Sequence, residues 1–242
     1  MKIIGIIPAR YASTRFPGKP LIQIAGKSMI QRTWEQACKA KLLSEVIIAT
    51  DDERIKTEAE NFGATVAMTS ANHHSGTDRC AEVVSKLNDA DAVINIQGDE
   101  PFIHPDQIDV LASTFINNNL TEIVTLIKAI ELQQEIENPN VIKVARSSNG
   151  QALYFSRSVI PYQRDKTQHH FTYFKHIGIY GYRKDVLLKI VSLQQSTLEI
   201  TESLEQLRWM ENGYHIETII TNFENQSIDT PDDLEKIKEV YV

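Results

Sequence analysis

The feature that most constrains the fold is an alternation, through the first hundred residues, between short apolar runs and amphipathic stretches. Four runs are rich in β-branched residues and apolar on both faces, which is typical of strands buried in a parallel sheet. They are residues 3–7, 46–49, 64–68 and 92–96. The order β-α-β-α-β-α-β predicts an α/β fold with a mostly parallel sheet flanked by helices.

Capping residues indicate where the intervening helices begin and end. Ser28 opens a capping box ahead of a helical stretch that reaches residue 40, and Asp52 precedes a helix that Gly63 ends. Thr77 or Asp78 is expected to cap a third helix that runs to about residue 87. These positions support the same α/β order.

The second half has an antiparallel character. Residues 141–146 and 151–156 flank Asn149-Gly150, the pair favoured in two-residue type I′ hairpins. Farther along are a strand-like run at 178–182, an amphipathic stretch at 198–211, a strand-like run at 215–220, and a closing helix with Pro231 at its first position. We expect a single domain over residues 1–242, with an antiparallel elaboration at about 151–183.

Composition narrows the class of protein. The chain has 242 residues and a formal net charge of −7, with no long basic tract, which argues against non-specific nucleic-acid binding. It has no secretory signal at its start and no run near the ~18 apolar residues that span a bilayer. We therefore expect a cytoplasmic globular protein without a membrane span, in which Cys38 and Cys80 are reduced, buried thiols rather than a disulfide.

The segment after the first strand carries three cations. Arg10, Arg15 and Lys19 lie among small residues and hydroxyls within residues 7–21, at the carboxyl end where open α/β sheets bind ligands. A triphosphate carries several negative charges, and two unit charges ~4 Å apart repel by roughly 4 kcal/mol at an effective dielectric constant near 20. Converging cations and backbone N–H groups suit such a ligand, although a solvated basic loop is the alternative interpretation.

A second segment, Gln97-Gly98-Asp99-Glu100-Pro101, follows the strand at 92–96. A carboxylate at a carboxyl end can hold Mg²⁺ through oxygen, and a simple glycine turn is the alternative. Asp229 is a candidate second ligand or a helix cap. Two acids plus substrate phosphates form a normal Mg²⁺ arrangement, because the ion seldom has an all-protein cage.

Several familiar motifs are absent. The P-loop glycine expected five residues before Gly26 is Leu21, and no G-x-G-x-x-G follows a strand, which disfavours a dinucleotide-binding oxidoreductase. Ser156 lacks the setting of a serine hydrolase nucleophile. The histidine pairs at 73–74 and 169–170 lack zinc-ligand spacing, so surface or hydrogen-bonding roles are favoured.

His176 stands apart, since it begins the segment 176–183, where a neutral imidazole and a Tyr hydroxyl could bind sugar hydroxyls.

Together these segments resemble a known family. Residues 8–15 and 18–21 resemble the 3-deoxy-manno-octulosonate cytidylyltransferases, the CMP-Kdo synthetases of lipopolysaccharide assembly. So do, in the family's order, residues 75–79, 97–101, 153–157, 176–183, 204–208 and 229–231. The resemblance covers essentially the whole chain.

The resemblance implies a nucleotide-diphospho-sugar transferase type of α/β fold in a Mg²⁺-dependent homodimer, with the antiparallel arm at the dimer interface. It implies synthesis of CMP-Kdo and pyrophosphate from CTP and Kdo. The implied mechanism is in-line attack of the anomeric 2-hydroxyl of Kdo on the α-phosphorus, with positioning and charge neutralisation as the main contributions of the protein. No side chain stands out as a general base.

The site residues that the resemblance implies fall into three groups. The nucleotide-binding group is Pro8, Ala9, Arg10, Ser13, Arg15, Lys19, Gln97 and Asp99. The sugar-acid group is Arg79, Gln97, Arg157, His176, Tyr182 and Glu205. Asp99 and Asp229 are the implied Mg²⁺ ligands, and Arg15 and Lys19 are expected to neutralise the departing pyrophosphate.

The chain departs from the family pattern in three places. Asp78 replaces the Glu of many relatives, and Tyr162 replaces the usual Trp. Residues 166–173 have no clear counterpart, and a role in the interface or as a lid stays open.

Three rival functions remain. A cytidylyltransferase for 8-amino-Kdo or a nonulosonic acid fits the same residues, and only a panel of sugar acids separates them. A non-catalytic nucleotide sensor would tolerate loss of the metal acids, but Asp99 and Asp229 are both present. A metal-dependent glycosyltransferase needs an Asp-x-Asp after a strand, whereas Asp89-Ala90-Asp91 precedes one.

Overall fold

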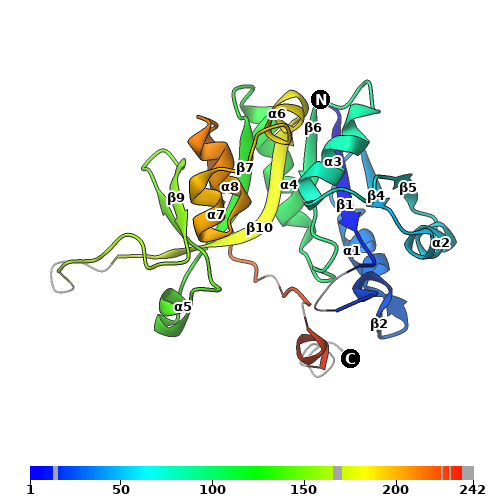
Figure 1. Ribbon diagram of the computed structural model, residues 1–242, viewed down its shortest axis with the longest axis horizontal. Coiled ribbons are helices and arrows are strands. Elements are labelled where there is room, and N and C mark those ends of the chain that lie inside the picture. The colour runs from blue at the N-terminus through cyan, green and yellow to red at the C-terminus, as the bar shows by residue number, and fades with distance from the viewer. Residues whose placement is uncertain (13–15, 166–170, 225, 229, 236–242) are drawn as a thin grey trace.

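One mixed sheet forms the centre of the structure, a computed structural model that describes residues 1–12, 16–165, 171–224, 226–228 and 230–235. The strand order is β11-β7-β10-β6-β1-β4-β5 (Figure 1). Its parallel part contains the four strands expected from the sequence: β1 (Ile3–Ala9), β4 (Glu45–Thr50), β5 (Thr65–Met68) and β6 (Ala92–Asn95). β1 pairs in parallel with both β4 and β6, and β5 pairs with β4.

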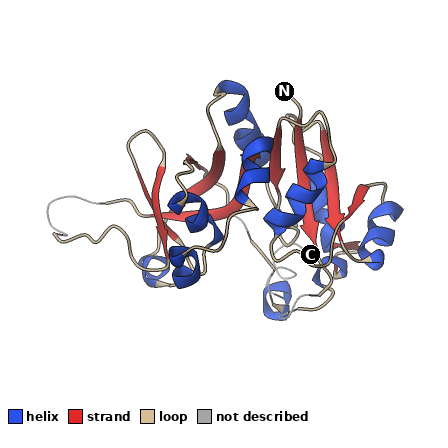
Figure 2. Cartoon of the chain, turned by 45° about the horizontal axis from the view of Figure 1, so that its top comes forward, coloured by secondary structure: helices blue, strands red, loops and turns tan. Residues whose placement is uncertain are grey.

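β1, β4 and β6 are buried on both faces, whereas β5, at the edge of the sheet, is partly exposed along its length, contrary to the expectation for residues 64–68. Ile4 and Ile6 of β1 belong to one core cluster, Ile3 and Ile7 belong to another, and all four are 0% exposed. Because successive side chains of a strand point to opposite faces, apolar residues at every position require cover on both sides. Helices supply that cover (Figure 2): α1 (Met29–Ala37), α2 (Glu53–Asn61), α3 (Gly76–Ser85) and α4 (Pro105–Asn117).

Two of the three predicted helix starts are confirmed. The side chain of Ser28 accepts a hydrogen bond at the start of α1, and that of Asp52 does so at the start of α2. For α3 the prediction was wrong, because the cap is Ser75. Its hydroxyl accepts from the backbone N–H of Asp78 at 3.1 Å while the Asp78 carboxylate accepts from the backbone N–H of Ser75 at 3.1 Å. Asp78 is thus the third residue of a capping box.

The second half adds antiparallel strands to the sheet. β10 (Phe174–Arg183) runs antiparallel to β6 on one side and to β7 (Ile123–Ala129) on the other, and β11 (Ile216–Ile220) pairs in parallel with β7. β8 (Lys143–Arg146) and β9 (Ala152–Ser156) form an antiparallel pair that joins the sheet through β10. Figure 1 shows β9 and the segment that follows it extending away from the parallel part.

The connection between β8 and β9 is not a two-residue type I′ turn. That turn needs a positive φ at both central residues, but Gly150 has φ 90° and Asn149 does not have a positive φ. Instead Ser147 N–H donates to the Gln151 carbonyl at 2.9 Å, and the Ser147 hydroxyl accepts from Gln151 N–H at 3.0 Å. The side chain of Ser147 therefore closes a longer loop that the dipeptide pattern alone did not predict.

The amphipathic stretch at 198–211 forms two helices, α7 (Thr197–Glu202) and α8 (Glu205–Glu211), because Ser203 between them has a left-handed backbone with φ 52°. Residues 231–235 are helical after Thr230, in agreement with the sequence. The sequence patterns did not single out α4 or β7. The remaining elements are a 3₁₀ turn η1 (Lys19–Leu21), β2 (Gln23–Ile24), β3 (Lys27–Ser28), α5 (Gln133–Glu137) and α6 (Lys184–Ile190).

Two further expectations concern cysteines and membrane spans. Cys38 and Cys80 are both free thiols, as predicted, but Cys38 is exposed rather than buried. In the described ranges no helix is long and apolar enough to cross a bilayer.

Candidate functional site

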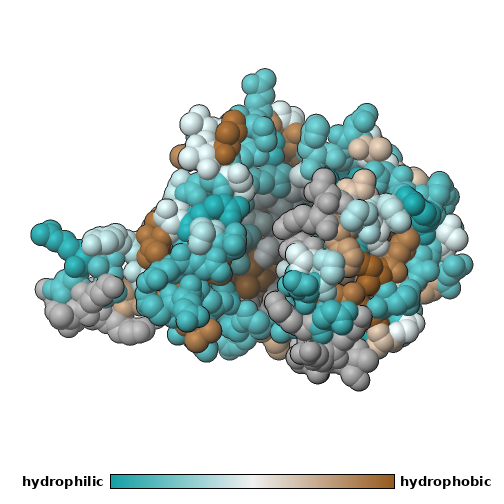
Figure 3. All heavy atoms as spheres, turned by 60° about the horizontal axis from the view of Figure 1, so that its bottom comes forward, coloured by the Kyte–Doolittle hydropathy of each residue, from teal (hydrophilic) through white to brown (hydrophobic). Residues whose placement is uncertain are grey.

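The candidate site lies where the loops after three parallel strands meet. Arg10 follows β1, Asp51 follows β4 and Gln97 follows β6, and the carboxyl ends of parallel strands share one edge of a sheet. A cleft of about 340 Å³ opens at this edge. Its walls are formed by Pro8, Ala9, Arg10, Lys19, Pro20, Met29, His73, His74, Ser75, Gly76, Arg79, Gln97, Gly98 and Asp99. The face toward the viewer in Figure 3 is hydrophilic over most of its area and hollowed near its middle.

Two glycines let the walls of this cleft approach one another. A Cβ atom on Gly76 would lie 3.0 Å from Cγ of Pro8, and one on Gly98 would lie 3.0 Å from the carbonyl oxygen of Pro8. Both distances are too short for an ordinary contact, so a side chain at either position would push the α3 start or the β6 loop away from β1. The glycines therefore allow Ser75, Gln97 and the β1 loop to face a common ligand.

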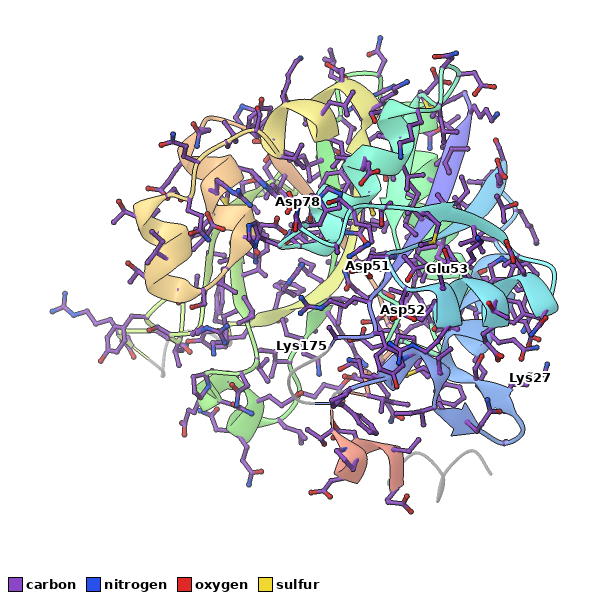
Figure 4. All side chains as sticks on the ribbon, turned by 45° about the vertical axis from the view of Figure 1, so that its right-hand side comes forward. Lys27, Asp51, Asp52, Glu53, Asp78 and Lys175 are labelled. Atoms are coloured by element: carbon purple, nitrogen blue, oxygen red, sulfur yellow. The ribbon has the colours of Figure 1, made fainter. Side chains whose placement is uncertain are left out.

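The N-terminus of α3 forms one wall of the cleft, and its capping box uses the backbone N–H groups of Ser75 and Asp78. Helix N-termini carry unsatisfied N–H groups and a partial positive charge, which favours bound anions. Arg79, one turn into the ten-residue helix, is only 3% exposed. Its guanidinium donates to the Thr69 hydroxyl and lies 3.5 Å from a carboxylate oxygen of Asp51 (labelled in Figure 4). Asp51 and Thr69 thus fix the position of Arg79 at the cleft wall.

Lys19 and Asp99 face each other in the cleft. The Lys19 ammonium donates to Oδ2 of Asp99 at 2.7 Å, and the two side chains are 13% and 26% exposed. The backbone carbonyl of Asp99 accepts a hydrogen bond from Ile228 N–H at 3.0 Å. Asp99 is therefore held from two directions, by the β1 loop and by the segment near the C-terminus.

The structure gathers most of the nucleotide-binding residues expected from the sequence. Those that line the cleft are Pro8, Ala9, Arg10, Lys19, Gln97 and Asp99. Ser13, Arg15 and Asp229 lie outside the described residues, so the structure does not locate the second expected metal ligand.

The sequence patterns did not predict that two adjacent histidines form part of the cleft wall. His73 and His74 line it, and Nε2 of His73 lies 2.6 Å from a carboxylate oxygen of Glu82 on α3. Glu82 also accepts from Lys86 and from the backbone N–H of Ser70, and these contacts, with that of Lys86 foremost, lower the pKa of its carboxyl to about 2. His73 and His74 directly precede Ser75, the cap of α3, and this position in the sequence could have predicted that they lie at the cleft.

Glu205 lies on the other side of the α3 start. Thr77 donates to its Oε2 at 2.8 Å and Arg208 donates to its Oε1 at 3.0 Å. Burial raises the pKa of the Glu205 carboxyl above its usual range, and the Thr77 hydroxyl and Arg208 only partly offset this. Since Ser75 and Gly76 line the cleft and Thr77 contacts Glu205, one turn of helix joins the two regions.

His176 and Tyr182, both expected on the sugar-acid side, are joined into a row of rings by Tyr180, which the sequence patterns did not single out. The ring of His176 lies 5.1 Å from that of Tyr180, which lies 5.8 Å from that of Tyr182. Trp209 packs edge-on against both tyrosines. Desolvation lowers the pKa of His176 to about 4 and raises the pKa values of both tyrosines well above their usual range. All three groups are therefore neutral at pH 7.

Arg157 is placed differently from the other expected sugar-acid residues. Its guanidinium donates to the backbone carbonyls of Glu202 at 2.7 Å and Pro139 at 3.1 Å. It follows β9 and does not line the cleft. In this arrangement Arg157 holds α7 against the β8–β9 pair.

The cleft has the chemistry of a polyanion site. Arg10, Lys19, Arg79 and the α3 N-terminus supply positive charge, and Asp99 supplies one carboxylate. Among the described residues, no cluster of three or more His, Cys, Asp or Glu side chains could hold a metal by itself. Within that part of the chain, a cation bound at Asp99 would find no cage of such side chains, and oxygens of a ligand or of water suit its remaining coordination positions.

Comparison with known proteins agrees with this chemistry. Residues 4–220 match the family described as cytidylyltransferase. The chain is 52% identical to the 3-deoxy-manno-octulosonate cytidylyltransferase of Cytophaga hutchinsonii, covering 98% of this chain and 96% of that protein. It is 53% identical to the protein of the same name from Parabacteroides distasonis, with coverage of 98% and 96%.

Solved structures give the same result. The fold matches CMP:2-keto-3-deoxy-manno-octonic acid synthetase complexed with CTP, with a TM-score of 0.94 and 43% identity over 99% of this chain and 98% of that one. A more distant match, 4-diphosphocytidyl-2C-methyl-D-erythritol synthase from Anaerococcus prevotii, has a TM-score of 0.63 and 14% identity over 98% of this chain and 95% of that one, and is evidence of the fold alone.

Proposed function

Since this chain belongs to the 3-deoxy-manno-octulosonate cytidylyltransferase family, we propose that it transfers CMP from CTP to the anomeric 2-hydroxyl of Kdo and releases pyrophosphate. The observation that carries the proposal is the cleft at the carboxyl edge of β1 and β6. There Arg10, Lys19 and Arg79 converge with Asp99 in a fold that matches a CTP-bound synthetase at 43% identity.

The positively charged side chains that line the cleft would bind the triphosphate of CTP. Lys19 and Arg10 neutralise phosphate charge, and the N–H groups at the start of α3 add hydrogen-bond donors. The 2-hydroxyl oxygen of Kdo would then form a bond to the α-phosphorus as the bond from the α-phosphorus to the bridging oxygen of pyrophosphate breaks, and the hydroxyl proton would pass to solvent. The protein's part is to hold these atoms in line and to compensate the charge on the departing pyrophosphate. We extend this charge role to Arg15, and phosphate binding to Arg15 and Ser13, on sequence grounds.

A magnesium ion fits the donors of the cleft. Mg²⁺ prefers carboxylate and phosphate oxygens and keeps several waters, so Asp99 together with CTP supplies suitable ligands, and Asp229 is proposed as the second carboxylate. When bound, the ion would neutralise charge on the phosphates and make the 2-hydroxyl a better nucleophile. The Lys19 ammonium lies 2.7 Å from the same carboxylate, so it would be close enough to neutralise part of the negative charge of the phosphates.

The sugar acid would lie beyond the α3 start. Gln97 and Arg79 line the cleft, while Glu205, Tyr182 and His176 form the neighbouring buried row. A carboxylate and neutral ring groups suit sugar hydroxyls, and Arg79 suits the carboxylate of Kdo. Arg157 would serve the sugar-acid side by holding α7 in place rather than by contacting the sugar directly.

The pathway, the location and the oligomeric state are proposed from the family and from exposed apolar side chains. We propose that the enzyme serves lipopolysaccharide biosynthesis in the cytoplasm and works as a homodimer through the elaboration at 151–183. Exposed apolar side chains support the interface, since Leu153 on β9 is 60% exposed and Tyr162 is 85% exposed. A charged substitution, Leu153→Asp, should therefore shift the species measured by light scattering from dimer to monomer.

A pyrophosphate-release assay tests the proposed function. The enzyme is incubated with Mg²⁺ and Kdo and either CTP, UTP or ATP, and then with CTP and a panel of acidic sugars that includes 8-amino-Kdo and a nonulosonic acid. Release that requires both CTP and Kdo supports the proposal. Faster release with another sugar acid would reassign the substrate, and no release with any sugar would remove the activity.

A further inference from the structure

The hydroxyl of Thr125 on β7 lies among several buried polar groups. It lies 2.7 Å from the carbonyl oxygen of Ile179, 3.3 Å from that of Ile177 and 3.0 Å from Nε2 of His176. Thr125 is 0% exposed, so bulk water does not reach its hydroxyl. The Tyr180 hydroxyl also interacts with Thr125 and can donate to its second lone pair, so the proton count covers Thr125, His176, Tyr180 and the two carbonyls.

A local irregularity of β10 brings these groups together. The pairing of β10 with β7 shifts between Ile177 and Tyr180, so that Tyr180 lies opposite Thr125 while Ile177 lies opposite Leu126. Residues inserted in one strand re-aim side chains and free backbone groups from the ladder. Here two carbonyls and an imidazole all face one hydroxyl, which a regular strand would not allow.

Counting protons fixes the direction of each hydrogen bond. A threonine hydroxyl has one proton and two lone pairs, whereas a carbonyl oxygen can only accept. The nearest acceptor, the Ile179 carbonyl, takes the proton of Thr125. Thr125 can then only accept from His176, so Nε2 of His176 carries a hydrogen.

The opposite assignment is unfavourable. If Thr125 donated to Nε2, its lone pairs would face two carbonyl oxygens at 2.7 and 3.3 Å with no hydrogen between them. Two oxygens 2.7 Å apart with no hydrogen between them repel each other. The arrangement thus selects one of the two neutral tautomers of His176.

The other ring nitrogen of His176 is then a lone-pair acceptor. Desolvation keeps the imidazole neutral, with a pKa of about 4, so Nδ1 carries no hydrogen when Nε2 does. The His176 residue retains partial exposure, and the hydrogen bonds found in the described part of the chain involve Nε2 and not Nδ1. The rings of Phe155 and Tyr180 pack at 5.3 and 5.1 Å and limit how the imidazole can turn.

We propose that Thr125 is a positioning residue whose hydroxyl holds His176 as the Nε2–H tautomer, leaving Nδ1 to accept a hydrogen bond from a hydroxyl group of the acidic sugar. This inference rests on the proposed function for its ligand, but its structural half concerns the free enzyme. Thr125 contacts no part of the cleft itself and acts only through His176.

The first test reads the tautomer directly in the ligand-free protein. Long-range ¹⁵N–¹H NMR spectra of the labelled full-length enzyme at pH 7 distinguish the protonated from the unprotonated nitrogen, and His176→Gln assigns the signals. We expect Nε2–H with an unprotonated Nδ1 in the wild type and in Thr125→Ser. In Thr125→Val, which removes the hydroxyl at nearly constant shape, we expect loss of that single tautomer. An Nδ1–H tautomer in the wild type, or an unchanged Nε2–H tautomer in Thr125→Val, would overturn the assignment.

The second test asks whether the tautomer serves the sugar. Thr125→Val should raise KM for Kdo about tenfold, the scale of one hydrogen bond, and leave KM for CTP within about twofold. Thr125→Ser should rescue the Kdo value. His176→Gln keeps a group that can reach Thr125 but lacks the Nδ1 acceptor, so it should raise KM for Kdo without unfolding the protein, and adding Thr125→Val should have little further effect.

The outcomes separate this inference from the proposed function. Equal increases in KM for CTP and Kdo, or failure of Thr125→Ser to rescue, would reduce Thr125 to a structural role. If the wild type releases no pyrophosphate with CTP and Kdo, the proposed function fails while the NMR result still decides the tautomer.

Discussion

Lys19 and Asp99 form a 2.7 Å ion pair across the cleft although they are 80 positions apart in the chain. The pair joins the loop after β1 to the loop after β6, and both side chains keep some exposure to the cleft. In the proposed function, Lys19 is the cation for phosphate and Asp99 is the carboxylate for a metal. Their contact gives the cleft a fixed charge arrangement before a ligand arrives.

Replacing Lys19 with methionine should weaken CTP binding. The change keeps most of the side-chain volume but removes the positive charge, and a charge-assisted contact to phosphate is worth more than a neutral one. We expect KM for CTP to rise about tenfold or more and kcat to fall, with a smaller change in KM for Kdo. Steady-state kinetics with each substrate varied in turn measures this.

Lys27 provides the matched control for that variant. It lies on the outlying β2–β3 hairpin (Figure 4), pairs with Glu35 at 2.7 Å and does not line the cleft. Lys27→Met should leave both KM values near those of the wild type. Similar losses in the two variants would point to net charge rather than to the position of Lys19.

Asp99→Asn should keep the fold and lose most turnover. The amide is nearly isosteric but no longer a charged ligand, and it weakens the pair with Lys19. We expect kcat to fall about 100-fold or more, with CTP binding partly retained in calorimetry. Asp106→Asn is the control, since its side chain is 70% exposed on α4. Activity near that of the wild type in Asp99→Asn would remove Asp99 from the metal site.

Glu205→Ala should act on the sugar side. The carboxylate accepts from Thr77 and Arg208 on the far side of the α3 start, so its loss should mainly raise KM for Kdo. Glu211→Ala, an exposed position at the other end of α8, is the comparison. A rise in KM for CTP alone would move Glu205 to the nucleotide side.

The stability of the enzyme should fall in mild acid partly because of His176. Its pKa is lowered from 6.5 to about 4 by desolvation, so as pH falls below about 6.5 the unfolded chain takes up a proton that the folded protein refuses. Stability from this source is therefore full above pH 6.5 and is progressively lost toward pH 4. The melting temperature of His176→Gln should decline less than that of the wild type across this interval, and parallel declines would contradict the lowered pKa.

Much of the fold was predictable because local patterns agree with the final packing. The doubly apolar run at the start of the chain forces burial on both faces, and Ser28 and Asp52 cap helices where the sequence predicts. The parallel order also predicts that Arg10 and Gln97 meet at one edge, and both line the cleft.

Other features depend on contacts between distant parts of the chain. The partner of Lys19 and the turn of β10 that presents His176 to Thr125 have no short-range signature. The choice of Ser75 over Thr77 as the helix cap follows from Glu205, which takes the Thr77 hydroxyl from 128 positions away. The division of the chain as a single domain and the roles of Ser13, Arg15 and Asp229 stay predictions.

Transfer of the sugar hydroxyl to the α-phosphorus of CTP in this cleft can be observed by ³¹P NMR of the reaction. With CTP, Kdo and Mg²⁺, we expect the CTP signals to be replaced by equal amounts of pyrophosphate and a CMP phosphodiester, and Asp99→Asn to abolish both. Formation of CDP and inorganic phosphate would instead show attack at the γ-phosphorus and rule out the proposed reaction.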